Sequence, residues 1–146
     1  MGVRTEDKDL ARWTISIAEA FIRDSVSSEQ IDYVYMGEVL QGGCGQVPSR
    51  QATRKAGLPW EVPSITVNKV CSSGLITVSL ADKAIRLGEI DIAVAGGMES
   101  MSNAPYFLPG MRWGSRMMNS SAVDLMVNDG LWCSFYDRHM AFDGSR

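Results

Sequence analysis

Residues 64–78 read Ser64-Ile-Thr-Val-Asn-Lys-Val-Cys-Ser-Ser-Gly-Leu-Ile-Thr-Val78, a segment that combines the signals of a strand, a turn and a helix. A β-like run ends at Cys71, and the small residues after it open a helix. Backbone N–H groups at a helix start lack partners within the helix and carry the positive end of its dipole. Both favour the thiolate, the nucleophilic form of cysteine. The pattern therefore predicts a reactive Cys71; the alternative is a small buried apolar side chain, the usual role of a free cysteine.

Composition indicates an ordinary globular domain. The chain has 146 residues, of which 45% are hydrophobic and 21% charged, so it is long enough to bury a core. The net charge of -3 and the scattered Lys and Arg residues argue against nucleic acid as a partner. No apolar run approaches the ~20 residues of a membrane span, and the charged N-terminal residues do not fit a signal peptide. We therefore expect a cytoplasmic protein with no membrane partner.

The cysteines support the same compartment. Cys44, Cys71 and Cys133 have neither the spacing of metal ligands nor the even count of a disulfide framework. We therefore predict no metal site and free thiols in a reducing cytosol. Cys44 and Cys133 lack the strand–turn–helix context, so we expect both to be buried or incidental.

Hydrophobic periodicity predicts alternating helices and strands. Apolar residues recur at helical spacing before residue 24, and Pro48 suits the start of a second helix. Gly57 and Gly88 suit helix ends. The run 90–95 is nearly all apolar, as in a strand covered on both faces. We predict helices over about 9–24, 48–57 and 73–87, strands over 33–36, 64–68 and 90–95, and an α/β fold with a parallel or mixed sheet.

Two glycine clusters mark turns. Gly96 and Gly97 follow the last predicted strand, at the carboxyl end where open α/β sheets bind ligands. After them, residues 98–121 show no sustained period, which suggests function or packing against another part. We therefore divide the chain into a core, 1–97, and a second region, 98–146. The cluster Gly42, Gly43 and Gly45 fits neither a dinucleotide nor a P-loop pattern and predicts a tight turn.

Three further sets of residues allow a functional and a structural interpretation. His139, the only histidine, is either a base for Cys71 or a packing residue. The methionines of the second half favour adaptable packing over an acyl-chain pocket. Arg112, Arg116 and Arg138 either bind phosphate or are solvated, and solvation is favoured.

Longer segments carry a combined pattern. They are Met36-Gly-Glu-Val-Leu-Gln-Gly-Gly-Cys-Gly-Gln46, Pro48-Ser-Arg-Gln-Ala52, Val67-Asn-Lys-Val-Cys-Ser-Ser-Gly-Leu75 and Ala95-Gly-Gly-Met-Glu-Ser-Met-Ser-Asn-Ala-Pro-Tyr106, continued by Arg112-Trp-Gly and Asp129-Gly-Leu. From about residue 9 to about 140, the chain resembles the N-terminal half of a thiolase, an acetyl-CoA C-acyltransferase. The Gly-Gly-Met-Glu-Ser-Met-Ser segment disfavours related condensing enzymes such as ketoacyl synthases and hydroxymethylglutaryl-CoA synthases.

The resemblance implies a function. Thiolases cleave 3-ketoacyl-CoA with CoA or condense two acetyl-CoA molecules, without a metal or a cofactor beyond the CoA thioester. Cys71 would accept the acyl group, and its backbone N–H would belong to an oxyanion hole. His139 and Met140 match a pair that lines the CoA and acyl pocket, which weakens the case for His139 as the base. The region from residue 98 would begin the family's loop domain, which binds CoA and carries homo-oligomer contacts.

The departures from the family pattern lead to further expectations. The family's activating histidine and second, proton-shuttling cysteine belong to a C-terminal half, and no Gly-His-Pro or Cys-x-Gly segment is present here. The first strand is reduced or missing, with 3–5 as a remnant. We expect a truncated thiolase that needs the second half, with an exposed apolar face on helix 73–87 that promotes self-association. The alternatives are a non-catalytic CoA-binding or interaction fragment and an incomplete gene product without a role.

Overall fold

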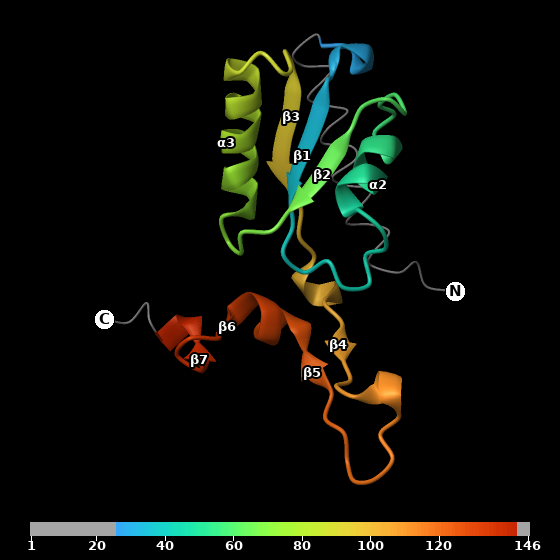
Figure 1. Cartoon of the computed structure of the whole chain (residues 1–146), viewed down its shortest axis with the longest axis vertical. Helices are drawn as coiled ribbons and strands as arrows, with labels where there is room; N and C mark the ends of the chain where they lie inside the picture. The colour runs from blue at the N-terminus through green and yellow to red at the C-terminus, as the bar shows by residue number, and fades with distance from the viewer. Residues whose placement is uncertain (1–25, 143–146) are drawn as a thin grey trace.

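The computed structural model describes residues 26–142, in which a three-stranded sheet is flanked by two helices (Figure 1). The strands are β1 (Tyr33–Gly37), β2 (Ser64–Val67) and β3 (Ala93–Gly97), and the helices are α2 (Pro48–Lys55) and α3 (Ser73–Arg86). A short 3-10 turn, Ser28–Gln30, precedes β1. The predicted helix over 9–24 and the remnant of a first strand lie outside the described residues.

The sheet has the order β2-β1-β3, and β1 pairs in parallel with both neighbours. Val34 is the register partner of Ser64 on one side and of Val94 on the other. The α/β class is therefore confirmed. The described strands of this sheet are all parallel, and antiparallel pairing occurs in two short ladders of the second region.

The prediction of a strand over 90–95 was wrong at both ends, because β3 begins at Ala93 and extends through Gly97. The backbone N–H groups of Asp91 and Ile92 donate to the Asp32 carboxylate at 2.8 and 2.9 Å, so a side chain takes the donors that a longer strand would have used. The strand is also half-buried along its length instead of fully covered. Asp32, the residue directly before β1, thus causes β3 to begin later than predicted. A hydrogen bond between segments so far apart in the sequence cannot be recognised from local hydrophobic periodicity.

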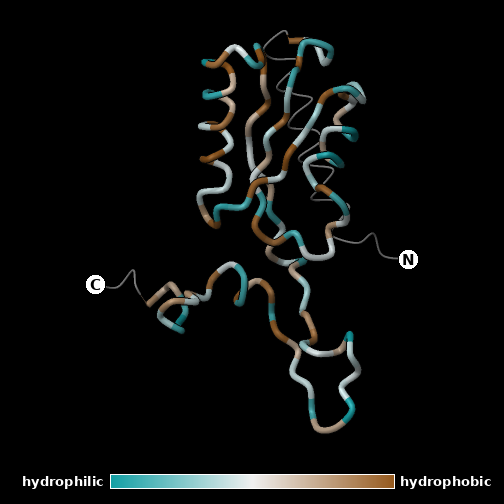
Figure 2. Tube along the Cα trace, in the orientation of Figure 1, coloured by the Kyte–Doolittle hydropathy of each residue, from teal (hydrophilic) through white to brown (hydrophobic). Residues whose placement is uncertain are grey.

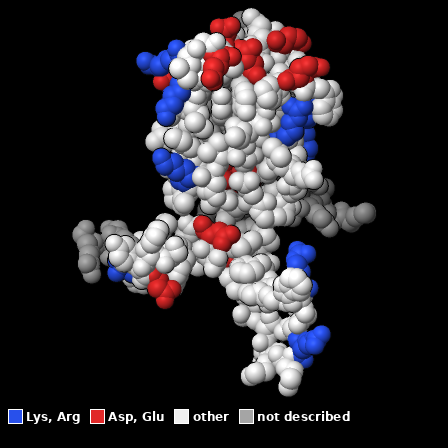
Figure 3. All heavy atoms as spheres, in the orientation of Figure 1, with Lys and Arg blue, Asp and Glu red and all other residues white. Residues whose placement is uncertain are grey.

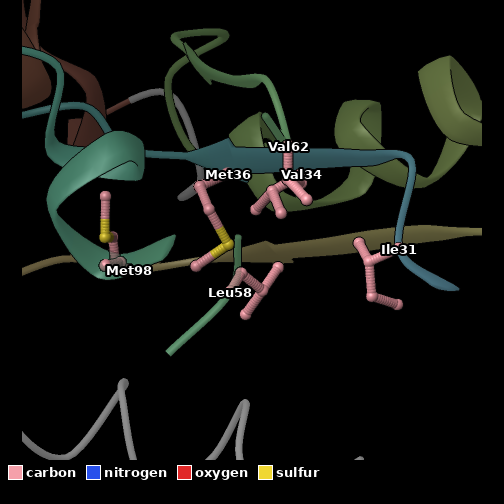
Figure 4. Packing of buried hydrophobic residues seen from close by; sticks show 7 residues of the cluster. Ile31, Val34, Met36, Leu58, Val62 and Met98 are labelled. Carbon is pink, nitrogen blue, oxygen red and sulfur yellow. The ribbon is translucent and has the colours of Figure 1, made fainter. Parts of the chain in front are cut away.

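Helix α2 and the loop after it close the main apolar core against one face of the sheet. The core contains Ile31, Val34, Met36, Ala52, Leu58, Val62 and Met98. Val34 and Leu58 are fully buried, and Met36 and Leu58 point toward one another (Figure 4). Because alternate residues of a strand face opposite sides, Val34 and Met36 face α2 while Gly37 faces α3.

Helix α3 buries small residues and exposes large ones. Ser73, Thr77, Ala81 and Ala84 form its buried face. Apolar side chains outside this buried face are exposed, at 75% for Leu75, 54% for Val78 and 44% for Ile85 within the helix, and at 74% for Leu87 directly after its end. Figure 2 shows hydrophobic positions along α3. An exposed apolar face on this helix, as expected from the sequence, is therefore present in the described chain.

The region after Gly97 extends away from the sheet as short elements (Figure 1). Its ladders are β4 (Tyr106–Phe107) with β5 (Val123–Asp124) and β6 (Trp132–Cys133) with β7 (Arg138–His139). Its other elements are short helical turns, Met101–Asn103, Met111–Trp113 and Met140–Phe142, and the π-helical turn Met126–Leu131. The domain boundary at Gly97 stays a prediction.

Candidate active site

The turn between β2 and α3 positions Cys71. β2 ends at Val67 and α3 begins at Ser73, as the sequence predicts within one residue. Val70, directly before the cysteine, has a left-handed backbone with φ of 49°, which is unfavourable for a β-branched residue. Such strain persists only where the surroundings impose it, and it is frequent at functional turns.

Hydrogen bonds from side chains within the turn impose this conformation. The buried Ser73 hydroxyl accepts from the backbone N–H of Lys69 at 2.7 Å and donates to the carbonyl of Val70 at 2.6 Å. The Asn68 carboxamide oxygen accepts from the backbone N–H of Val70 at 2.9 Å. These bonds fix the backbone on both sides of Val70 and so position the neighbouring Cys71, whose own side chain makes no hydrogen bond within residues 26–142.

Close backbone packing places this turn against the carboxyl ends of β1 and β3. A Cβ on Gly37 would lie 2.3 Å from the Ser73 carbonyl carbon, and one on Gly97 would lie 3.4 Å from the Gly74 Cα. The Thr77 hydroxyl donates to the carbonyl of Gly96 at 3.0 Å. From the sequence, Gly96 and Gly97 were predicted to lie where a ligand binds. In the structure, Gly97 allows α3 to pack closely against the sheet, and it also lines the cavity that contains Cys71.

A cavity of about 370 Å³ lies where these segments meet. Its lining includes Cys71, Leu40, Leu131 and three methionines, Met98, Met101 and Met126. The methionines of the second half were expected mainly to pack adaptably. Met98, Met101 and Met126 line the cavity that contains Cys71, whereas Met117 and Met118 are 86% and 92% exposed.

The Cys71 side chain is exposed, which excludes the alternative of a small buried apolar residue. Within residues 26–142, the backbone N–H of Cys71 donates to no protein acceptor. Both the sulfur and an N–H donor are therefore available at the start of α3. Of the other cysteines, Cys44 is also exposed, so it is not buried, and Cys133 is half-buried; that both are incidental to the chemistry stays a prediction.

Two carboxyl groups at this end of the sheet were not among the site residues predicted from the sequence. Glu38 follows β1 and is only 6% exposed, and Glu99 lies two residues after β3. Burial, and secondarily the charge of Glu99, raises the pKa of Glu38 to about 7. A glutamate directly after a buried strand was a signal that could have identified this site.

His139 and Met140 lie elsewhere in the described structure. His139 pairs with Trp132 in the β6–β7 ladder, and its Nδ1 accepts from the backbone N–H of Ala141 at 3.2 Å. Neither residue lines the cavity that contains Cys71. The structure thus does not bring His139 to Cys71 as a base, and the roles of His139 and Met140 in CoA binding stay predictions.

The remaining candidate groups give no second site. Arg112 and Arg116 are exposed, and the Arg138 guanidinium lies 5.2 Å from the centre of the Tyr136 ring. Figure 3 shows Asp and Glu side chains gathered at the upper end of the molecule, where the strands begin. In the part of the chain that the structure describes, no three His, Cys, Asp or Glu side chains are placed to hold a metal ion. No helix within 26–142 has the length and apolar character to cross a membrane.

Comparison with known proteins identifies the family. Residues 4–146 match the model of the thiolase N-terminal domain. The chain belongs to the thiolase family. The matched residues include the strand–turn–helix segment that holds Cys71 and the Gly-Gly-Met-Glu-Ser-Met-Ser segment, and in the structure both segments contribute residues to the lining of one cavity.

Individual relatives carry the name acetyl-CoA acetyltransferase. The chain is 54% identical to one from Pseudomonas aeruginosa over 76% of its length and 28% of the relative. It is 52% identical to one from Cupriavidus necator over 86% of its length and 32% of the relative. It is 46% identical to acetyl-CoA acetyltransferase 1 of Arabidopsis thaliana over 90% of its length and 32% of the relative. The chain thus spans about a third or less of these thiolase-family relatives.

Proposed function

We propose that this chain supplies the nucleophile of a thiolase-type acyltransferase, with Cys71 as the acyl acceptor. The observation that carries the proposal is the exposed Cys71 at the start of α3, beside an apolar cavity of about 370 Å³. The substrate class is a CoA thioester, as the names of the relatives suggest. The reaction is formation or thiolytic cleavage of acetoacetyl-CoA or another 3-ketoacyl-CoA.

The first step is acyl transfer to sulfur. The Cys71 thiolate attacks the thioester carbonyl, the bond from that carbon to the CoA sulfur breaks, and the CoA thiolate leaves and takes a proton. The free backbone N–H of Cys71 is a donor for the oxyanion that forms in between. The apolar side chains of the lining, Leu40, Leu131 and three methionines, offer contacts for the apolar part of the acyl group.

The remaining groups of the reaction are assigned by the resemblance. The base that activates Cys71 and the second cysteine belong to a C-terminal half of the family pattern, so we propose that turnover needs such a half. His139 and Met140 are proposed to contact CoA. A cytoplasmic location and a homo-oligomer are further proposals; β2 is an edge strand of the sheet formed by the described residues, and its Ile65 is 41% exposed, which supports contact with another chain.

Mass spectrometry of the intact chain after incubation with acetyl-CoA tests the first step. We expect a single acetyl adduct that maps to Cys71, that is absent from the Cys71→Ala variant, and that persists in Cys44→Ser and Cys133→Ser. An unmodified Cys71 in a folded sample would contradict the proposal.

A non-catalytic CoA-binding role is the second candidate. The observation that favours it is the placement of His139 away from the cavity, which leaves Cys71 without a histidine among the cavity residues described. Calorimetric titration with CoA separates the two candidates, because binding of CoA without acetylation of Cys71 supports only the second.

A further inference from the structure

Glu38 is a buried acid at the carboxyl end of β1. Its Oε2 atom is buried and has no hydrogen-bond partner within residues 26–142. The backbone N–H of Glu38 donates to the Val67 carbonyl at 3.0 Å, so the residue is anchored between β1 and β2. The titratable groups that act on it in the described chain are Glu99, from the segment after β3, and Cys44, from the glycine-rich turn.

Glu99 connects the segment that follows β3 to the segment that follows β1 through hydrogen bonds. Its two carboxylate oxygens accept from the backbone N–H groups of Val39 at 2.9 Å and Leu40 at 3.1 Å. Hydrogen bonds from backbone N–H groups are strongest to an ionised carboxylate. Val39, Leu40 and Glu99 all line the cavity that contains Cys71, so this pair of bonds fixes one wall of it.

The two carboxyl groups cannot both be charged without cost. Burial disfavours the charged form of Glu38, and the like charge of Glu99 disfavours it further; the side-chain hydrogen bond with Cys44 favours the charged form but is the smallest of these three effects. Since Glu99 has two donors and Glu38 Oε2 has none, the stable arrangement leaves the charge on Glu99 and the proton on Glu38.

We propose that Glu38 is a positioning residue for the Cys71 site: its neutral carboxyl group lets the Glu99 carboxylate hold Val39 and Leu40 in the cavity wall. When Glu38 gives up its proton to solvent, its charge repels Glu99, and Glu99 releases the two backbone N–H groups. The wall then loosens beside Cys71. The inference rests on the proposed function only for the role of Cys71, because the two carboxyl groups and their bonds stand independently of it.

Hydrogen exchange at single amides tests the inference. Protection of the Val39 and Leu40 amides is measured in the wild-type chain and in Glu38→Gln from pH ~6 to pH ~8, the range around a pKa of about 7. The reference is the Asp32 amide, which donates to the Ile92 carbonyl at 2.9 Å at the other end of the sheet. We expect wild-type protection at Val39 and Leu40 to fall about fivefold relative to Asp32, whereas in Glu38→Gln the ratio stays constant.

The same pH dependence in both proteins would overturn the inference. If Glu38→Gln fails to fold, carboxyl carbon NMR of the wild-type chain gives the titration midpoint of Glu38 directly, and a midpoint in the ordinary range near 4.5 overturns it. Glu99→Gln removes the neighbouring charge and is expected to lower that midpoint; an unchanged midpoint also counts against it. Acetylation of Cys71 is measured separately, at pH ~6. If Cys71 is not acetylated but the protection of Val39 and Leu40 shows the expected pH dependence, only the proposed function is contradicted.

Discussion

Gly37 and Ser73 lie in direct backbone contact: a Cβ on Gly37 would be 2.3 Å from the Ser73 carbonyl carbon and 2.5 Å from its oxygen. This contact joins the end of β1 to the start of α3, two residues after the candidate nucleophile Cys71. Only a residue without a side chain fits there.

Gly37→Ala is therefore expected to lower the free energy of unfolding by about 3 kcal/mol, because the atoms that the methyl group meets are backbone and cannot rotate away. Denaturant unfolding measures the change. Gly96→Ala is the matched control on β3, since its Cβ would meet the Met36 sulfur at an ordinary 3.6 Å. Equal effects for the two variants would contradict the contact.

Removing the Ser73 hydroxyl leaves the Lys69 backbone N–H without its acceptor. Ser73→Ala is expected to cost about 2 kcal/mol of stability and to slow acylation of Cys71, because the turn is less firmly held. Ser72→Ala is the neighbouring control, since Ser72 only donates to the Lys69 carbonyl from a more accessible position. We expect that control to lie within ~0.5 kcal/mol of wild type by the same unfolding assay.

The left-handed backbone of Val70 predicts a stabilising substitution. Asparagine adopts this conformation with less strain than valine, so Val70→Asn is expected to raise stability by about 1 kcal/mol. Val67→Asn, at an ordinary strand position of β2, is expected to lower it. Thermal unfolding of both variants tests the assignment, and a loss of stability at position 70 would argue against strain there.

Glu38 gives a pH dependence of defined sign. Because its pKa is about 7 in the folded chain against 4.5 ordinarily, the folded state holds the proton longer. Stability should therefore fall as pH rises from about 4.5 to about 7, by about 3 kcal/mol relative to Glu38→Gln. Unfolding curves of both proteins across this range measure the difference, and parallel pH profiles would show that Glu38 does not cause it.

Asp32 supplies a control with the opposite sign. The backbone N–H groups of Ile92 and then Asp91 hold the pKa of the Asp32 carboxyl below 3.8. Its contribution to stability is present above pH 3.8 and is lost as pH falls further. Asp32→Asn should therefore change only the acid limb of the profile and leave the limb assigned to Glu38 intact.

The exposed apolar face of α3 predicts self-association of the chain. Burial of apolar area is worth roughly 25 cal/mol per Å², so covering Leu75 and Leu87 on contact is favourable. The double substitution of both leucines by lysine is expected to shift sedimentation toward the monomer. Lysine at the exposed positions Asn119 and Ser120 matches the added charge, and an equal shift in that control would assign the effect to net charge.

Local signals in the sequence were enough to place α2, β2 and α3. Pro48 and Gly57 bracket α2, and the run from Ser64 through Ser73 places β2, the turn and α3 within one or two residues. Dihedral preferences and hydrophobic period act over a few residues, so they can be read without the fold. The motifs around Cys71 and Gly97 also carried the family, which the match over residues 4–146 shows.

How these pieces combine depends on the tertiary structure. Hydrogen bonds to Asp32 take the N–H groups of Asp91 and Ile92, so β3 begins only at Ala93. The fold also places the carboxyl groups of Glu38 and Glu99 at one end of the sheet, although 60 residues separate Val39 from Glu99. Burial, like-charge repulsion and backbone contact depend on distances in space. Those distances follow from the order β2-β1-β3, which brings the exits of β1 and β3 side by side beneath Cys71.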